Sequence, residues 1–383
     1  MGKIKSDRVG NVSIISGNPV FIPHKFHPDG PEINVNLELF NLLDEAARAL
    51  GELKGITETL PDPDLFVAFY VRKEALLSSQ IEGTQCSLDE VIQVDEKTSE
   101  VEPVAEVVNY INAMNYGLNN LSTLPISKRL IHRIHKKLLE GVRGKEKTPG
   151  EYKHTQNWIG PPGSKIEEAE YIPPPPHMME EYMSDFEKYY HEDHKENKFP
   201  PLIETAILHS YFETIHPYAD GNGRLGRLLI TFMLCERKVL DKPLLYLSLF
   251  FKENKSYYYD LLMNVRINGE WEEWIKFFLR GVRNTSLEAI KTANEIKLLQ
   301  EKDRSSILQE SSHKIAIQCF DLICRYPIIS ISAGVKNLNS NYPSIKRAFD
   351  DLIRLGILEY HSTKRRKKIF SYAKYLQILR RGT

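Results

Sequence analysis

The chain has 383 residues, of which 42% are hydrophobic and 27% charged, an ordinary composition for a globular protein of two or three domains. No apolar run approaches the about 18 residues that span a bilayer, and the N-terminus lacks the apolar stretch of a signal peptide. The four cysteines are scattered, which favours reduced thiols over a disulfide framework or a metal site. These features argue against a membrane-spanning or secreted protein, and we expect a cytoplasmic one.

The first 35 residues carry scattered Pro and Gly and predict extended backbone that wraps a domain. Apolar residues at three- and four-residue spacing then predict a series of helices. These helices are expected over residues 37–53, 67–81, 104–121, 127–141, 177–191, 203–215 and 224–240. A loop and a flap are expected over residues 141–176. A last long helix is expected to begin at Trp271, break near Gly281 and run toward Leu308.

The charge balance changes after Ser311. Residues 312–383 hold fourteen Lys and Arg against four Asp and Glu, so this tail carries a net charge of +10 and the rest of the chain −10. The predicted order of its elements, in which a third helix at 344–355 precedes two strands flanking 362–368, resembles a winged helix. Residues 344–368, including the basic wing Lys364–Lys368, could therefore contact DNA phosphates. The alternative is a module that binds protein or forms a dimer, with a merely solvated wing.

Residues 216–227 are the most informative segment, and they read His-Pro-Tyr-Ala-Asp-Gly-Asn-Gly-Arg-Leu-Gly-Arg. Gly221 and Gly223 permit backbone angles closed to other residues, and Asn222 between them tolerates the left-handed region. Such a turn can aim successive N–H groups at one anion, and it precedes a predicted helix whose dipole also favours negative charge. The segment therefore predicts a phosphate-binding site.

The charged side chains of this segment support the same prediction. Arg224 and Arg227 share one helix face, where their guanidinium groups suit a polyphosphate. Asp220 is placed to hold Mg²⁺ beside the phosphates, and a neutral His216 could accept a proton from an attacking hydroxyl. The alternative, a hairpin turn built on Asn-Gly with unrelated charges around it, does not explain the cations in the first helical turn.

This segment resembles the signature of the Fic (Fic/DOC) family, His-Pro-Phe, any residue, Asp or Glu, Gly-Asn-Gly-Arg, two residues and Arg, with Tyr218 in place of Phe. The resemblance implies a mainly α fold, in which a helical domain with a short β-hairpin flap precedes the small α+β tail. It also implies transfer of AMP from ATP to a hydroxyl of a target protein. The implied roles are general base for His216, metal ligand for Asp220, and nucleotide binding for Gly221, Asn222, Gly223, Arg224 and Arg227.

A second motif lies upstream at Ser78-Ser79-Gln80-Ile81-Glu82-Gly83, and it resembles the inhibitory helix of the same family. The resemblance implies that Ser78, Glu82 and Gly83 end a helix over about residues 67–83, and that Glu82 pairs with Arg227 and restrains ATP binding. The alternative is a solvated glutamate at the end of an ordinary helix. In part of the family this glutamate also orients a water for removal of AMP.

The flap and two tyrosines complete the candidate site. The resemblance implies that residues 156–176, with Tyr171 and Ile172, hold the target by adding a strand. The proline run 173–176 would end the flap, although a polyproline ligand for another domain is an alternative. Relatives carry an aromatic against the adenine near Tyr258 and Tyr259, which equally fit plain core packing.

We therefore expect an N-terminal helical region at 1–120, a catalytic core at 121–311 and a winged-helix-like domain at 312–383. The expected activity is autoinhibited, Mg²⁺-dependent AMP transfer from ATP to a Ser, Thr or Tyr hydroxyl, including one of the protein's own. The resemblance also implies a homodimer. Two alternatives remain: the same fold with a different transferred group, or a regulator that acts mainly by binding DNA.

Overall fold

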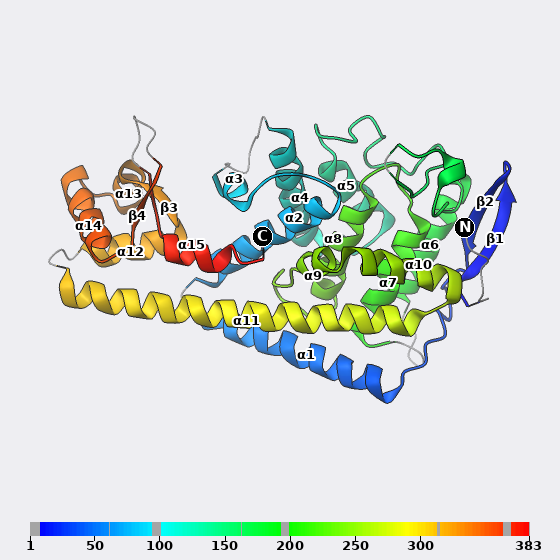
Figure 1. The fold of residues 1–383 in the computed structure, drawn as a ribbon, viewed down its shortest axis with the longest axis horizontal. Helices are drawn as coiled ribbons and strands as arrows, with labels where there is room; N and C mark the ends of the chain where they lie inside the picture. The colour runs from blue at the N-terminus through cyan, green and yellow to red at the C-terminus, as the bar shows by residue number, and fades with distance from the viewer. Residues whose placement is uncertain are drawn as a thin grey trace. The chain divides into compact units, whose positions relative to one another are not determined.

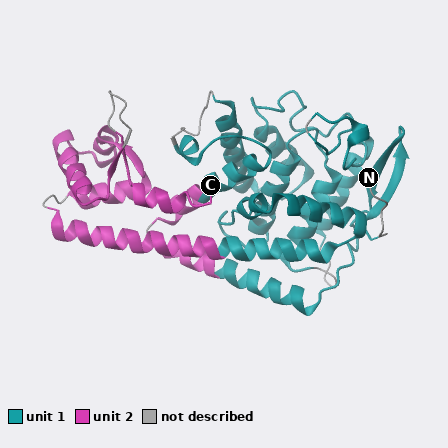
Figure 2. Cartoon of the chain, viewed as in Figure 1, with its two compact units in different colours: residues 1–51, 70–286 teal, residues 52–69, 287–383 magenta. Residues whose placement is uncertain are grey.

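The structure is a computed structural model that describes residues 8–60, 62–93, 101–161, 163–192, 199–311, 315–362 and 369–382. Over these residues it is mainly helical, as the sequence predicts, and it contains two small antiparallel sheets. The chain forms two compact units, one from residues 1–51 and 70–286 and the other from residues 52–69 and 287–383 (Figure 2). No helix in the described ranges combines the length and apolarity that a membrane span requires.

The first unit contains the candidate site, and Figure 1 labels its elements. They are β1 (Gly10–Ile15), β2 (Asn18–Pro23), the first part of α1 (Leu37–Glu58), most of α2 (Pro63–Ile81), α3 (Leu88–Gln93), α4 (Glu102–Asn120), α5 (Lys128–Leu138), α6 (Met179–His191), α7 (Pro201–Ile215), α8 (Asn222–Glu236), α9 (Ser248–Glu253), α10 (Lys255–Asn268) and the start of α11 (Trp271–Glu310). The predicted helices are present with shifted ends, while α3, α9 and α10 have no counterpart among the predicted ranges.

Helices α7 and α8 form the buried centre of this unit, and they pack against each other. Every residue of α7 from Leu202 to Ile215 is buried, so the helix is surrounded on all sides. At its end His216 adopts a left-handed conformation with φ 48°, and Gly221 precedes α8 with φ 77°. The signature segment is therefore a tight connection between two buried helices.

Helix α2 carries the second motif. It begins at Pro63, four residues earlier than predicted, because the Asp62 carboxylate accepts a hydrogen bond from Leu65 N–H at 2.9 Å and Pro is favoured in the first turn. It ends at Ile81, and Gly83 has φ 94°, so the predicted glycine stop is confirmed.

The structure corrects a prediction about Gly281 and gives more detail on the N-terminal extended segment. The predicted break near Gly281 is wrong, because α11 is one continuous helix of 40 residues. A Cβ at Gly281 would lie 2.7 Å from the Phe250 ring, so the glycine permits close packing and does not end the helix. The N-terminal extended segment folds into the β1–β2 hairpin, whose two turn residues, Ser16 and Gly17, both have positive φ.

The flap is less regular than predicted. It contains one antiparallel bridge, Ile159 with Tyr171, and no two-stranded ladder among its described residues. Proline lacks the N–H that a ladder requires, and Pro161 and Pro173 stand close to either side of the bridge. Next to it, Ile172 C=O accepts a hydrogen bond from Phe21 N–H of β2 at 2.9 Å.

The second unit contains the C-terminal elements, α12 (Ile315–Arg325), β3 (Ile328–Ser330), α13 (Ile331–Leu338), α14 (Tyr342–Arg354), β4 (Glu359–Ser362), β5 (Ile369–Ser371) and α15 (Ala373–Leu379). Their order agrees with the predicted one, except that α15 was not predicted. The strands form an antiparallel sheet in the order β3-β5-β4. The basic stretch Lys364–Lys368 lies outside the described residues.

Candidate active site

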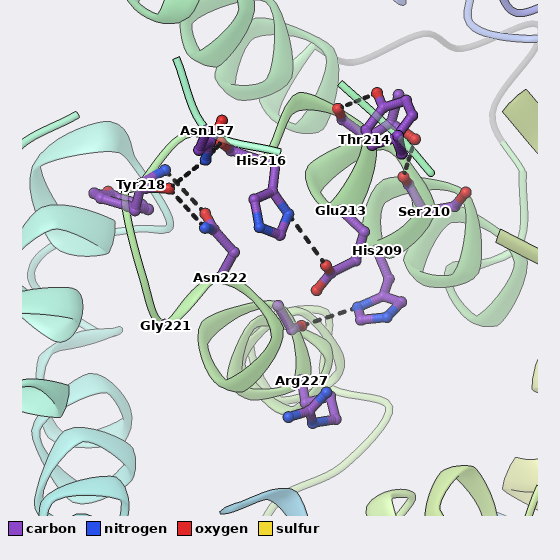
Figure 3. Close-up of polar contacts among 12 residues, drawn as sticks. Asn157, His209, Ser210, Glu213, Thr214, His216, Tyr218, Gly221, Asn222 and Arg227 are labelled. Carbon is purple, nitrogen blue, oxygen red and sulfur yellow. Dashed lines mark hydrogen bonds and ion pairs between the residues drawn. The ribbon is translucent and has the colours of Figure 1, made fainter. Parts of the chain in front are cut away.

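His216 caps the end of α7, and its backbone is held from a distant segment. The Asn157 amide donates to His216 C=O at 3.3 Å and to Tyr218 C=O at 2.9 Å. The imidazole is 19% exposed, and it lies between Asn222 and Glu213 in Figure 3. Burial, together with the charges of Lys153 and Arg266, lowers the pKa of His216 to about 3. The imidazole is therefore neutral near pH 7, the form that can accept a proton.

The turn after His216 is built by side chains as well as by glycine. Asn222 accepts a hydrogen bond from Tyr218 N–H at 2.9 Å and donates to Tyr218 C=O at 2.8 Å (Figure 3). Gly221 alone among the three turn residues has positive φ. The predicted special backbone angles at Asn222 and Gly223 are therefore wrong: both begin α8, where the first N–H groups have no partner inside the helix. Those groups remain available to an anion.

Tyr218, at the position where the signature has Phe, is fully buried and gains polar contacts. Its O–H lies 3.1 Å from His132 Nδ1, and its ring stacks on His135 with centroids 3.8 Å apart. His135 Nδ1 accepts from Gly150 N–H at 2.9 Å, so its Nε2–H donates to Asp220 C=O at 3.0 Å. These two histidines, which the sequence analysis did not assign to the site, therefore support the turn from α5.

The Asp220 carboxylate lies at the open side of the turn. It is 37% exposed, and its Oδ1 accepts from Gly221 N–H at 2.6 Å. No group of three or more His, Cys, Asp or Glu that could hold a metal occurs among the described residues. A single exposed carboxylate beside the predicted phosphate site fits Mg²⁺, which often takes one carboxylate and completes its shell with phosphate and water.

Arg224 is buried but incompletely paired. Its Nη1 lies 3.6 Å from Glu106 Oε2, and its Nη2 lies 3.8 Å from Asp220 Oδ1. Its Nε and Nη1 make no hydrogen bond to any described residue. A buried guanidinium with unused donors is costly unless a ligand satisfies it. Arg224 thus has the properties expected of a phosphate ligand.

Arg227, one turn later, is fully engaged by the end of α2. Its Nη2 donates to Glu82 Oε1 at 2.7 Å and to Ser78 C=O at 3.0 Å, and its Nε donates to Ser78 Oγ at 2.8 Å. The Glu82 carboxylate also rests against Gly223, where a Cβ would lie 2.3 Å from Oε1. The structure therefore brings Ser78, Glu82, Gly223 and Arg227 together.

The charges of the Glu82–Arg227 pair reinforce each other. Burial raises the pKa of Glu82, but the Arg227 charge and hydrogen bond outweigh it and hold that pKa below its ordinary value. Burial likewise opposes the charge on Arg227, yet Glu82 raises the pKa of Arg227. Both partners are therefore ionised near neutral pH.

The two tyrosines differ. Tyr258 is buried, and its O–H donates to His209 Nε2 at 2.9 Å, because His209 Nδ1–H is used by Gly226 C=O at 3.1 Å. This places Tyr258 in the core and favours the core-packing alternative for this residue. Tyr259 is 42% exposed and remains available to a nucleotide.

The flap side chains also belong to the core. Tyr171 and Ile172 are buried; Tyr171 O–H donates to Thr214 C=O at 2.6 Å, and the Arg266 guanidinium lies 4.0 Å from the ring centroid. The two side chains therefore pack into the core, and a strand added by the flap would use its backbone.

Two buried carboxylates of the site were not predicted. Glu106 of α4 faces Arg224 and accepts a hydrogen bond from Thr84 Oγ1, whereas Glu213 of α7 lies beside His216. The sequence contained a signal for Glu213, since residues three apart share a helix face. It contained none for Glu106, which tertiary packing brings to the site.

Comparison with known proteins agrees with this geometry. Residues 40–119 match the family described as Fic/DOC family N-terminal, and residues 125–234 match the Fic/DOC family. "Probable protein adenylyltransferase" of Aquifex aeolicus is 26% identical over 182 residues, which cover 46% of this chain and 51% of the relative. "Protein adenylyltransferase Fic" of Culex quinquefasciatus is 26% identical over 238 residues, which cover 60% and 43%. The chain thus spans about half the length of these relatives.

A solved structure supports the fold. The crystal structure of a Fic family protein from Desulfovibrio desulfuricans G20 aligns with a TM-score of 0.59 and 19% identity, covering 89% of this chain and 97% of that one. Three observations agree on the family: the two matched segments of the chain, the signature turn between two buried helices, and this shared architecture. The chain is a member of the Fic/DOC family.

Proposed function

We propose that this chain is an autoinhibited protein adenylyltransferase, which transfers AMP from ATP to a Ser, Thr or Tyr hydroxyl of a target protein or of itself. The observation that carries the proposal is the joint placement of three features on the α7–α8 connection. These are the neutral His216, the free N–H groups at the start of α8, and the buried Arg224 with unused donors. The names of the relatives support the same reaction.

In this proposal the α8 N-terminus and Arg224 bind the phosphates of ATP. The N–H groups and the guanidinium would stabilise the negative charge that develops during transfer. Asp220 would hold Mg²⁺, and the metal would supply further charge neutralisation on the phosphates. The residues at this position fit that ion, because Asp220 is an exposed carboxylate next to the phosphate site.

His216 would act as general base in an in-line displacement. The target hydroxyl gives its proton to the neutral imidazole, its oxygen forms a bond to the α-phosphorus, and the bond to pyrophosphate breaks. No covalent enzyme intermediate is needed. Asn157 and His135 would hold the turn in place during this step.

Glu82 would restrain the reaction by competing with the nucleotide for Arg227. Its carboxylate occupies the space against Gly223 and binds the guanidinium that a triphosphate would otherwise use. Release of this contact would open the site without any change at His216. Removal of AMP through a water held by Glu82 is a second proposed use of the same residue.

Incubation of the Glu82→Gly variant with α-labelled ATP tests the proposal. We expect label in the protein and a mass increase equal to AMP, and no label when His216→Ala is added. Nucleotide binding should survive the second substitution. A different transferred mass would identify another donor, and absence of any transfer would reject the activity.

For the C-terminal unit we propose a winged-helix module, on the basis of its element order and its β3-β5-β4 sheet. Lys346 of its third helix already pairs with Asp350 at 2.8 Å, which reduces the positive charge that this face offers to DNA. A mobility-shift assay at moderate salt tests whether the full chain binds DNA; no shift would leave protein binding as the role of this unit.

A further inference from the structure

Glu213 and His216 lie one turn apart at the C-terminal end of α7. Residues three apart share a helix face, so both side chains point toward the signature turn. Glu213 Oε2 lies 3.8 Å from His216 Nδ1, the pair that a dashed line joins in Figure 3. The other ring nitrogen, Nε2, is therefore the one left free for a substrate.

Each of the two side chains carries a buried polar atom without a hydrogen bond. The Glu213 side chain is 7% exposed, and neither its Oε1 nor His216 Nδ1 makes a hydrogen bond to any described residue. Helix α8 leaves room for the carboxylate, since a Cβ at Gly226 would lie 2.4 Å from Oε1. A buried carboxylate without a partner costs stability, which calls for a compensating role.

The nearby cations are engaged elsewhere. Arg266 of α10 donates to Glu213 C=O at 3.0 Å and to Thr214 Oγ1 at 3.2 Å, and Arg227 of α8 is held by the end of α2. Thus neither guanidinium forms a hydrogen bond with the Glu213 carboxylate. The imidazole of His216 is the group on the same helix face that this carboxylate can serve.

We propose that Glu213 is a positioning residue for His216: its carboxylate accepts a hydrogen bond from Nδ1–H and so keeps Nε2 unprotonated and ready to act as the base. This inference rests on the proposed function. The separation of 3.8 Å exceeds a normal hydrogen bond, and such catalytic contacts are often long before substrate binds. The arrangement follows the logic in which a carboxylate orients the histidine base of a hydrolase.

The proton balance of the step is simple. The target hydroxyl transfers its proton to Nε2 as its oxygen bonds to the α-phosphorus, and pyrophosphate leaves with the electron pair. The Nδ1 proton stays on the ring, directed at Glu213, whose negative charge stabilises the imidazolium. Burial raises the pKa of Glu213 to about 7; the charge of Glu82 also raises it, whereas the charges of Arg227 and Arg266 lower it. An imidazolium cation next to Glu213 would favour the ionised carboxylate.

The tautomer of His216 can be read directly by NMR, without any turnover. Histidine labelled with ¹⁵N in both ring nitrogens would be incorporated, and the His216 signals assigned by their loss in His216→Ala. We expect the proton on Nδ1 in the parent protein and a mixture of tautomers in Glu213→Leu. A proton on Nε2 in the parent, or an unchanged tautomer in Glu213→Leu, would overturn the proposal. If the Glu213→Leu variant does not fold, the tautomer of His216 in the parent protein alone tests the proposal.

Kinetics in the Glu82→Gly background give a second reading. Glu213→Leu should lower kcat for AMP transfer by about 10- to 100-fold, part of what a positioned base contributes, with KM for ATP within about twofold. Glu213→Gln, whose amide oxygen can still accept from Nδ1–H, should lose less. A rise in KM alone would mean that Glu213 acts on nucleotide binding, and would reject the positioning role.

Glu204→Gln is the matched control, because Glu204 is an equally buried carboxylate of α7 that pairs with Arg237 at 3.1 Å. It should alter stability but neither the His216 tautomer nor kcat. If the Glu82→Gly parent transfers nothing from ATP, the proposed function fails, while the NMR spectrum still decides whether Glu213 orients His216. The two failures are therefore distinguishable.

Discussion

Arg224 and Arg227 lie one turn apart on α8, and each side chain is 1% exposed, yet their surroundings differ. Arg227 makes three hydrogen bonds to Ser78 and Glu82, whereas Arg224 has two ion pairs at 3.6 and 3.8 Å and unused donors. One guanidinium is thus satisfied by the protein and the other is left for a ligand. In the proposed enzyme, Arg224 is therefore ready to bind the nucleotide, whereas Arg227 is held by the end of α2.

The largest expected effect concerns stability. Arg227→Met should lower the free energy of unfolding by about 3 kcal/mol. This value is at the low end for breaking a buried ion pair, because Glu82 is 30% exposed. Arg224→Met should cost about 1 kcal/mol or less, since a buried charge with poor partners can be replaced at little loss. Urea unfolding followed by Trp fluorescence measures both, because Trp158, Trp271 and Trp274 all lie in the first unit. Equal losses of stability in the two variants would contradict the difference described between Arg224 and Arg227.

The next effect concerns release of Arg227. Glu82→Gly removes a charge-assisted hydrogen bond of about 1.5–3 kcal/mol, so ATP affinity should rise by roughly 10- to 100-fold. Calorimetric titration with ATP measures it. Glu140→Gly serves as the control, because Glu140 is an exposed residue outside the site. If Glu82→Gly does not raise the affinity for ATP, Glu82 does not restrain ATP binding.

A smaller effect is expected at Ser78. Ser78→Ala deletes the hydrogen bond from Arg227 Nε but leaves the one to Ser78 C=O and the Glu82 pair. Loss of one such bond is worth about 0.5–1.5 kcal/mol, so ATP affinity should rise by roughly 2- to 10-fold. Ser79→Ala removes a buried hydroxyl that makes no hydrogen bond to any described residue, and it should leave affinity unchanged.

The smallest expected effect is that of pH. Because the folded pKa of Glu82 is lowered, its stabilising contribution is present above the ordinary carboxyl pKa and is lost only as pH falls through the lowered value. The ratio of ATP affinity between Glu82→Gly and the parent should therefore stay constant from about pH 6 to pH 8. A ratio that changes across this window would show that another titrating group governs the contact.

Local sequence determined the helices and the signature turn, because apolar periodicity and a contiguous run of twelve residues specify backbone and chemistry without distant partners. The predictions for Gly281 and Gly223 were wrong, because these glycines are needed for the space that they leave for Phe250 and Glu82. Such space depends on neighbours far along the chain and has no local signature. The family resemblance, rather than any periodicity, brought Glu82 and Arg227 together in the sequence analysis.

Only the tertiary structure decided how the buried charges are shared. Glu82 and Arg227 are 145 residues apart, and Glu106 and Asn157 reach the site from other elements. Whether a buried carboxylate or guanidinium is satisfied depends on packing to within about 1 Å, since a hydrogen bond at 2.7–3.2 Å is largely lost beyond that range. The sequence thus determines which charged residues the site contains, and the tertiary structure determines which of them lack a protein partner.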